Sequence, residues 1–411
     1  MKHIFFNRFF HPDSSATSQM LSDLAFHWAA AGRDVHVVTS RIPGSDSPGE
    51  VVNGVTVHRV AAPSEGPHGL AQRAFAYAAY SLGARRAAMS LVSPGDVVIV
   101  KTDPPLLAPV LAHLAKGRGA HVVAWLQDLF PEVAVEYGVP GMRGPVAAML
   151  RRMRDRSLAR MDAVVAIGDA MASRVRDLGC VAPERVHVIH NWADGRAIAP
   201  LAPEANALRR AWNPGGAFLV AYSGNLGRVH EFDTLLGAAA LLAADPGIRF
   251  VVVGRGPRLA DVKARARRMG LANLRFEPHQ DRSVLAQSLG AADVHLAVLR
   301  PAFEGLVLPS KLYGIMAAGR PTIFVGSVTG ETGRILAETG AGLAVATGDA
   351  EGLAAAIRRL RDDASLCAAM GARARKALEE RYDMALAFAR WDAVIAPYCR
   401  KFGSADAASE G

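Results

Sequence analysis

Short, continuous runs of apolar and β-branched residues alternate with longer helix-like segments along almost the whole chain. Strands that are buried on both faces give such runs, and the helices between them cover a parallel sheet. The predicted strands of the first half are His3–Phe6, Val35–Thr39, Val97–Val100, Val122–Leu126 and Ala163–Ile167. Those of the second half are Phe218–Tyr222, Arg249–Val253, Leu274–Phe276, Val294–Val298 and Thr322–Val325. The pattern predicts an α/β protein with doubly wound parallel sheets.

A cluster of proline and glycine residues between Pro200 and Gly216 interrupts this alternation near the middle of the chain. The 411 residues also exceed one ordinary core, because a domain usually holds roughly 100–200 residues. We therefore predict two α/β domains whose strand ends face each other across a cleft. The predicted boundaries are 1–198 for the first domain, 199–216 for a linker, 217–382 for the second domain, and 383–411 for a helix that crosses back to the first domain and ends in a frayed tail.

Composition limits where the chain acts. No apolar run reaches the roughly 18–20 residues that a bilayer requires, and the polar residues within Met1–Arg8 favour a first strand over a signal peptide. The three cysteines, Cys180, Cys367 and Cys399, form no disulfide framework and no Cys-x-x-Cys pair, which favours the reducing cytoplasm. The net charge of +9 is compatible with nucleic acid, anionic lipid or a phosphate-bearing substrate.

A glycine-containing segment, Tyr222–Arg228, follows a predicted strand and precedes a predicted helix. Ligands of open parallel sheets bind at the carboxyl ends of strands. Glycine there lets backbone N–H groups approach a phosphate, and Arg228 or His230 could add positive charge. The alternative is a plain turn between a strand and a helix. The glycine turn Gly254–Pro257, after the next strand, is open to the same two interpretations.

A lysine stands where a helix is predicted to begin. Pro309 and Ser310 resemble a helix start, which places Lys311 in the first turn, where its charge opposes the helix dipole. A lysine in that position favours an anion-binding site. A solvated surface lysine is the alternative.

Together these motifs resemble family 4 of the retaining glycosyltransferases. The further segments that follow the order and spacing of the family are Val188–Asp194, Phe250–Pro257, Asn273–Phe276, Ala291–Val294 and Met316–Pro321. The closest resemblance is to the bacterial polysaccharide and lipopolysaccharide branch, which includes the colanic-acid and fucosamine transferases. It covers nearly the whole chain and implies the GT-B fold, with two Rossmann-like domains.

The resemblance implies where a nucleotide-sugar donor binds. The implied diphosphate ligands are Gly224, Asn225, Arg228 and Lys311. The candidates for contact with the donor sugar or nucleoside are Glu304, Ser310, Arg255 and His230. The chain departs from the family at Asn225 and His230, where many relatives carry Arg and Lys, and at Gly314, where they carry a glutamate that holds the ribose. Lys311 and Arg228 are expected to supply the missing charge.

The segment Phe10–Ser18 links the first predicted strand to its helix. The resemblance implies that small residues face the acceptor and the donor phosphate here, which makes Ser15 and Ala16 candidates for this phosphate loop. We predict that Ser18 is the N-cap of the helix.

Two carboxylates follow the buried strand that ends at Leu126. We predict that Asp128 points into the cleft, where it would accept the proton of the acceptor hydroxyl or hydrogen-bond the donor sugar. Glu132 is the second catalytic candidate. The alternative for Asp128 is a structural role as the cap of the following turn.

The segment Met142–Met161 combines an apolar helical face with many arginines. The apolar positions are Met142, Val146, Met149, Leu150, Met153 and Met161, and the basic ones are Arg143, Arg151, Arg152, Arg154, Arg156 and Arg160. One interpretation packs the methionine stripe on the sheet and leaves the arginines solvated. The other places a basic amphipathic helix on an anionic membrane or on a lipid diphosphate.

These observations predict a glycosyltransferase that moves a sugar, with retention, from a nucleotide-sugar to a membrane lipid or lipid-linked glycan. A UDP-sugar is the favoured donor, and the expected place is the inner face of the cytoplasmic membrane. No Asp-x-Asp motif follows a strand, so we expect no catalytic metal, no cofactor and, without an RNA motif, no nucleic-acid partner. The alternatives are a nucleotide-sugar 2-epimerase and a non-catalytic nucleotide-sugar-binding subunit.

Overall fold

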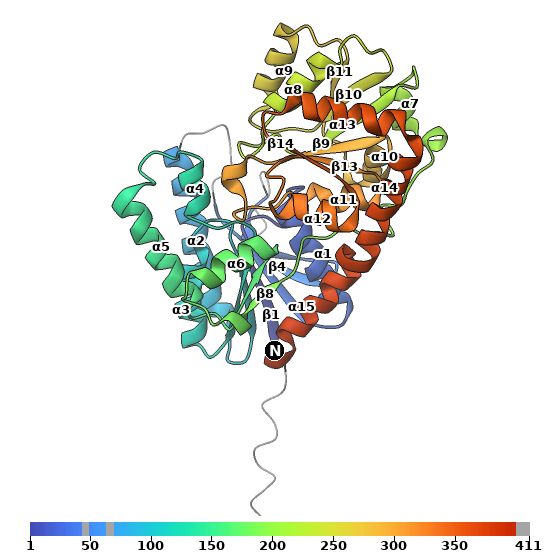
Figure 1. The fold of residues 1–411 in the computed structure, drawn as a ribbon. Helices are drawn as coiled ribbons and strands as arrows, with labels where there is room; N and C mark the ends of the chain where they lie inside the picture. The colour runs from blue at the N-terminus through green and yellow to red at the C-terminus, as the bar shows by residue number, and fades with distance from the viewer. Residues whose placement is uncertain (43–48, 63–69, 400–411) are drawn as a thin grey trace, which may run out of the picture. The chain divides into compact units, whose positions relative to one another are not determined.

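The computed structural model of the chain describes residues 1–42, 49–62 and 70–399, so the predicted frayed tail lies outside the described residues. The chain divides into two compact units (Figure 1). One consists of Met1–Ile189 with the chain from Phe388 onward, and the other is His190–Ala387. Within the described residues, none of the helices is both long and apolar enough to span a bilayer.

The first unit is built on an eight-stranded sheet with the order β3-β4-β2-β1-β5-β6-β7-β8. The strands are β1 (Lys2–Phe6), β2 (Asp34–Ser40), β3 (Gly49–Val52), β4 (Val55–Val60), β5 (Val97–Lys101), β6 (His121–Leu126), β7 (Ala163–Ala166) and β8 (Val186–Val188). All neighbours pair in parallel except β3 and β4, which form an antiparallel hairpin. The helices are α1 (Ala16–Ala30), α2 (Leu70–Leu91), α3 (Leu107–Gly117), α4 (Glu132–Glu136), α5 (Gly144–Leu158) and α6 (Asp169–Asp177).

The second unit has a six-stranded, fully parallel sheet with the order β11-β10-β9-β12-β13-β14. Its strands are β9 (Phe218–Ser223), β10 (Ile248–Val253), β11 (Leu274–Glu277), β12 (Val294–Val298), β13 (Thr322–Gly326) and β14 (Gly342–Ala346). Its helices are α7 (Ala207–Trp212), α8 (Asp233–Leu241), α9 (Leu259–Arg268), α10 (Leu285–Gly290), α11 (Lys311–Ala317), α12 (Glu331–Thr339), α13 (Ala350–Asp362) and α14 (Ala364–Ala377). The predicted architecture of two doubly wound parallel-sheet domains is confirmed.

Every predicted strand is present, with each end within one residue of its predicted position. The strands that the sequence did not predict are β3, β4, β8 and β14. The β3–β4 hairpin has a recognisable turn signal, since Asn53 and Gly54 both adopt positive φ, as the tightest hairpin turns require. Strand β14 is rich in glycine and alanine, which have low strand propensity, and it forms by pairing with β13.

The segment predicted as a linker, 199–216, contains the helix α7, which is capped by the Asn206 side chain and packs against α10. The chain before it also groups with the second unit, so the observed division falls between Ile189 and His190 rather than after residue 198. Arg375 explains this grouping, because its guanidinium donates to the carbonyl oxygens of Gly195 and Ile198, both at 2.8 Å.

The last described helix, α15 (Met384–Cys399), belongs to the first unit from Phe388 onward. Its Trp391 is fully buried, and its ring lies 4.7 Å from that of Trp125 in β6. The neighbouring Asp392 accepts a hydrogen bond of 2.8 Å from the indole N–H of Trp28 and pairs with Arg33 at 2.9 Å. The core of the first unit therefore includes residues from the far end of the chain.

Candidate active site

The order of strands in the second sheet reverses between β9 and β12. Open parallel sheets bind ligands at such a reversal, beside the carboxyl ends of the strands. The loop after β9 carries Gly224, and the chain after β12 leads to Lys311 at the start of α11. The two strongest sequence candidates for the diphosphate site therefore lie at this edge of the sheet.

Three glycines bring the loops after β9 and β10 into direct contact. Gly224, Gly254 and Gly256 have φ angles of 131°, 151° and 141°, which residues with a side chain rarely adopt. A Cβ at position 254 would overlap the carbonyl oxygen of Gly224, and one at position 256 would overlap the side chain of Asn225. The close approach of the two loops therefore requires glycine at these positions. A plain turn without such a contact would not require it.

Lys311 lies beneath this loop. Part of the side chain is exposed, but its Nζ atom is shielded from solvent and has no hydrogen-bond partner among the described residues. The Nζ atom is 3.4 Å from the centroid of the Tyr222 ring, and a Cβ at Gly224 would lie 3.5 Å from it. Burial lowers the pKa of Lys311 well below 10.5. The alternative of a solvated surface lysine is wrong, because α11 directs its first side chain under the loop.

His230 does not add charge, contrary to the sequence interpretation. Burial, together with the nearby charge of Lys311, lowers the pKa of His230 to about 3, so the ring is neutral at physiological pH. Its Nδ1 accepts a hydrogen bond of 3.1 Å from the backbone N–H of Gly227 and lies 3.2 Å from the Tyr222 hydroxyl. The histidine stabilises the loop as a hydrogen-bond acceptor, a role that protonation would remove.

The other predicted donor residues lie around these. Asn225, Arg228 and Arg255 are exposed, and the backbone carbonyl of Arg255 accepts a hydrogen bond of 2.7 Å from the N–H of Leu226. Ser310 precedes α11 as its N-cap but makes no capping hydrogen bond. Gly314 stands in place of the family glutamate and packs closely against Leu289. A Cβ at position 314 would lie 3.2 Å from Cδ1 of Leu289.

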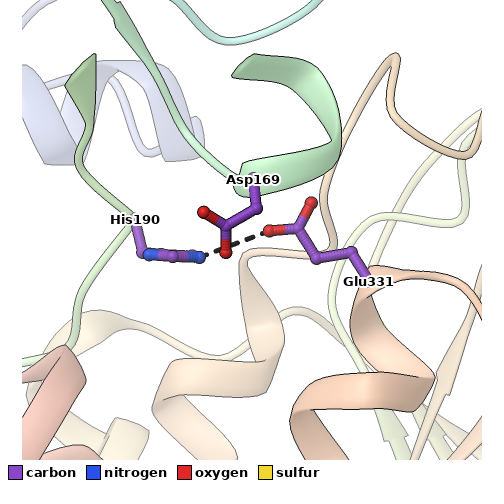
Figure 2. Close-up of side chains that lie close together, drawn as sticks. All are labelled: Asp169, His190 and Glu331. Atoms are coloured by element: carbon purple, nitrogen blue, oxygen red, sulfur yellow. Dashed lines mark hydrogen bonds and ion pairs between the residues drawn. The ribbon is translucent and has the colours of Figure 1, made fainter. Parts of the chain in front are cut away.

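Glu304 is held at the start of α12. Its Oε1 accepts a hydrogen bond of 2.7 Å from the backbone N–H of Glu331, the first residue of that helix. The Glu331 side chain is buried and bonds in turn to His190, with 3.3 Å between Nε2 and Oε1 (Figure 2). Neither His190 nor Glu331 was a predicted site residue. His190 and Glu331 are far apart in the chain, so no local sequence pattern pairs these two residues.

In the first unit, Asp128 follows β6 and is half-buried. Its Oδ1 is shielded from solvent and has no hydrogen-bond partner among the described residues. Burial raises the pKa of Asp128 to about 6, although a hydrogen bond with Thr102 opposes this. The next helix begins at Glu132 with Pro131 as its N-cap and without a side-chain capping bond, so Asp128 does not cap this helix. Raised carboxyl pKa values are typical of acid–base groups.

We expect Asp128→Asn to stabilise the protein at neutral pH. A carboxyl whose pKa is raised from 3.8 to about 6 binds more protons in the folded state, so stability falls as pH rises through that interval. Removing the charge should add about 3 kcal/mol at pH 7.5, or about 9 °C in the unfolding midpoint, and less than about 1 kcal/mol at pH 4. Thermal unfolding of both proteins from pH 4 to 8 measures the difference.

The matched control is Asp177→Asn, at an exposed position of α6. We expect it to shift the midpoint equally at all pH values. A difference between Asp128→Asn and the unmodified chain that stays flat with pH would contradict the raised pKa of Asp128.

Glu132, the second catalytic candidate, is committed to ion pairs. Its carboxylate accepts hydrogen bonds from Arg151 at 3.1 Å and from the buried Arg154 at 2.7 Å. Arg154 also pairs with Asp155 at 2.7 Å. A carboxylate that neutralises a buried guanidinium is poorly available as a base, since protonating it would leave that charge unpaired.

Lys101 is a buried group that the sequence interpretation missed. It ends β5, only 1% of its surface is exposed, and its Nζ lies 3.4 Å from the centroid of the Trp125 ring without a hydrogen-bond partner among the described residues. Burial lowers the pKa of Lys101 well below 10.5. Lys101 and Asp128 line the same cavity of about 40 Å³, which has room for a water molecule. A lysine inside an apolar strand is the signal that could have found it.

The phosphate-loop candidates lie at the start of α1. Ser15 is the N-cap, and its hydroxyl accepts a hydrogen bond of 3.4 Å from the N–H of Ser18. The same hydroxyl donates to the carboxylate of Asp13. The prediction that Ser18 is the N-cap is wrong, because the helix begins at Ala16, earlier than the apolar periodicity indicated.

Helix α5 buries one of its arginines, Arg154, together with small and apolar residues, and it exposes three of its large apolar side chains. Ala147, Arg154, Ser157 and Leu158 are buried, whereas the apolar side chains of Val146, Met149 and Met153 are 45%, 53% and 38% exposed. The exposed arginines are Arg143, Arg152, Arg156 and Arg160. The interpretation in which the methionine stripe packs on the sheet is therefore wrong for these three positions, and the buried face of α5 instead carries Ala147, Leu158 and the ion-paired Arg154.

Two family models match the chain. The model of the glycosyl transferase 4-like domain matches residues 16–192, and that of the glycosyl transferases group 1 matches residues 205–377. Together they account for both units apart from the first strand, the linking segment and the last helices.

Several named proteins are similar. A putative colanic acid biosynthesis glycosyl transferase, WcaI of Escherichia coli, is 33% identical over 258 residues, 61% of this chain and 63% of that protein, so less than two thirds of it is covered. A probable glycosyltransferase, WbjE of Pseudomonas aeruginosa, is 28% identical over 74% of this chain and 75% of its own. A GDP-mannose-dependent alpha-mannosyltransferase of Mycobacterium tuberculosis is 30% identical over 60% of this chain and 61% of its own.

Solved structures agree on the fold. Sucrose-phosphate synthase from Thermosynechococcus elongatus has a TM-score of 0.78 at 17% identity, with 97% of this chain and 98% of that chain covered. Anabaena HepE in complex with UDP-glucose has a TM-score of 0.73 at 15% identity, with 97% and 100% covered. With both units matched by family models and the fold matched over nearly its whole length, the chain belongs to family 4 of the GT-B glycosyltransferases.

Proposed function

We propose that this chain transfers a sugar from a nucleotide-sugar to a glycan acceptor in the synthesis of a cell-surface polysaccharide or lipopolysaccharide. The name of the colanic-acid relative supports the process, and the name of the Pseudomonas relative supports the sugar transfer. The observation that carries the donor is the Nζ of Lys311, which lies shielded beneath the glycine loop at the strand reversal and has no hydrogen-bond partner in the described part of the chain. A diphosphate at that loop would supply the anion that this amine lacks.

In the proposed reaction, the bond between the anomeric carbon and the donor diphosphate breaks, and a bond to the acceptor oxygen forms on the same face of the sugar. Lys311 would stabilise the negative charge that develops on the departing diphosphate. Asp128 is the candidate for receiving the proton of the acceptor hydroxyl, because a carboxyl with a pKa of about 6 is mostly ionised at neutral pH yet basic enough to accept it. Retention and independence of metal ions belong to the same proposal.

A panel of nucleotides and nucleotide-sugars tests the donor. We expect UDP and UDP-sugars to raise the unfolding temperature more than GDP or ADP compounds, as the UDP-glucose complex of HepE suggests. A ligand at a hundred times its dissociation constant adds about 2.7 kcal/mol to the stability of the folded state. A larger shift with GDP compounds would reassign the donor, and no shift with any of them would overturn the proposed function.

Release of labelled sugar distinguishes an enzyme from a non-catalytic binding subunit. The possibility of a non-catalytic binding subunit rests on Gly314, because glycine offers no carboxylate to a ribose. A transferase should release sugar from the donor in the presence of acceptor lipid extract, and Asp128→Asn should slow this release. Donor binding without turnover would favour the subunit.

We also propose that the acceptor is lipid-linked and that α5 binds an anionic membrane surface. The helix exposes Val146, Met149 and Met153 beside Arg152 and Arg156, the combination that inserts apolar side chains while cations attract lipid headgroups. This arrangement supports a peripheral position at the membrane.

Reversing two of these charges, Arg152→Glu with Arg156→Glu, should weaken binding to phosphatidylglycerol vesicles about 30-fold, because each cation contributes about 1 kcal/mol near such a surface. Flotation with vesicles measures the bound fraction. Arg85→Glu with Arg86→Glu, at exposed positions of α2, changes the net charge equally and should weaken binding only slightly. An equal loss in both variants would contradict the role of α5.

A further inference from the structure

Tyr222 connects the two parts of the candidate donor site. Its ring is 99% buried at the end of β9, and the Nζ of Lys311 lies over the ring face, 3.4 Å from the centroid. Its hydroxyl donates a hydrogen bond of 2.6 Å to the carbonyl oxygen of Asn225, within the glycine loop. One side chain therefore contacts both the lysine amine and the backbone of the loop that covers it.

The same hydroxyl lies 3.2 Å from Nδ1 of His230, which accepts the N–H of Gly227. Because the ring of His230 is neutral, it can serve as this acceptor at physiological pH. The loop is thus tied at its start, through Asn225, and at its end, through Gly227 and His230. The Tyr222 hydroxyl makes the first of these ties and lies beside the second.

The surroundings of the lysine amine contain no anion among the groups found to face it. From β9 it faces Tyr222, from the loop His230, and from β12 the buried His295. Burial holds the pKa of His295 at about 4 and raises that of Tyr222, so these groups are neutral at physiological pH. An amine in such a place loses hydration when charged, and only the ring face compensates part of that loss.

We propose that Tyr222 is the positioning residue of the donor site: its ring holds the Lys311 amine beneath Gly224, where the amine takes up a proton as the donor diphosphate binds. The inference rests on the proposed function, namely a nucleotide-sugar site in the second unit. The proton comes from solvent, the amine becomes an ammonium, and its new N–H groups donate to phosphate oxygens. No bond other than N–H forms in this step.

The coupling has a defined direction with pH. In the free protein burial lowers the pKa of Lys311 below 10.5, and a bound diphosphate raises that pKa again. Between the free and the bound pKa, binding takes up a proton, so affinity falls as pH rises. Below the free pKa the amine is already charged before the nucleotide binds. The affinity then no longer changes with pH through this group.

Isothermal titration of UDP, with GDP as a second probe, tests this in buffers of different ionisation enthalpy across pH 6.5–9. We expect the intact chain to take up a fraction of a proton per nucleotide, greatest where the pH lies between the free and the bound pKa of Lys311. Lys311→Met should abolish the uptake and weaken binding about 50-fold, as the loss of a charge-assisted hydrogen bond predicts. Tyr222→Phe retains the ring and should keep the uptake, with affinity changed about threefold or less.

Tyr222→Leu removes the ring and should weaken UDP binding about tenfold relative to Tyr222→Phe, and it should shift the pH window downwards because the free amine loses its only stabilising contact. In the background of Lys311→Met the two substitutions at Tyr222 should have equal affinities, since the ring acts through the lysine. Phe250→Leu, in the core of the same unit, is the control for packing loss and should leave proton uptake unchanged.

Each outcome decides something. UDP binding without proton uptake at any pH would overturn the inference and leave the proposed function intact. The same holds if Tyr222→Leu weakens binding equally with and without Lys311, because the ring would then be merely structural. If no nucleotide binds the folded chain, the proposed function fails and the inference fails with it.

Discussion

Gly254→Ala is expected to lower the stability of the second unit by about 3 kcal/mol, through an unfavourable positive φ and overlap with a neighbouring backbone. Position 254 has a φ of 151°, and its Cβ would overlap the carbonyl oxygen of Gly224, which no side-chain rotation can relieve. The loops after β9 and β10 must then separate. We therefore expect a fall of about 8 °C in the unfolding midpoint of this unit and loss of UDP binding.

Gly270→Ala provides the matched control. Gly270 also has a positive φ, 65°, but nothing lies within 4 Å of its Cβ position. The alanine should therefore lower the stability by only about 1 kcal/mol, the cost of its positive φ, and leave UDP binding unchanged. Similar effects of the two substitutions would show that contact between the two loops is unimportant for the site.

Trp391→Ala should destabilise the first unit by about 4 kcal/mol, a fall of about 12 °C in its unfolding midpoint, because a large buried aromatic side chain leaves a cavity. The ring is fully buried against Trp125 at 4.7 Å and Trp28 at 6.4 Å. The Trp125 ring also covers Lys101. We therefore expect that a Trp125 ring without the support of Trp391 disturbs the end of β5. Calorimetry measures both units in a single scan.

Trp391→Phe keeps most of the apolar volume and should cost about 1–2 kcal/mol. The prediction separates a helix that completes the core of the first unit from one that merely lies on its surface. If Trp391→Ala lowers the stability by less than about 1 kcal/mol, α15 merely lies on the surface of the first unit.

The strand–helix alternation predicted both sheets except β3, β4, β8 and β14, which lie at or next to the sheet edges, because apolar runs indicate burial of a strand whatever its neighbours are. Chemical clues of the same local kind identified the donor candidates. Glycines directly after strands allow close approach of backbones, and Lys311 occupies a helix start where its charge is unfavourable. Asp128 was identifiable because it directly follows a buried strand.

Contacts between distant residues decided the rest. The sequence of α5 does not show which face is buried, and the structure buries Arg154, which pairs with Glu132, 22 residues away in the chain. His230 and Lys311 both offer a cation to a phosphate in the sequence, but burial leaves the histidine neutral and places the lysine amine on the Tyr222 ring, 3.4 Å from its centroid. Ionisation and pairing depend on what surrounds a side chain in space, and local periodicity carries no information about that environment.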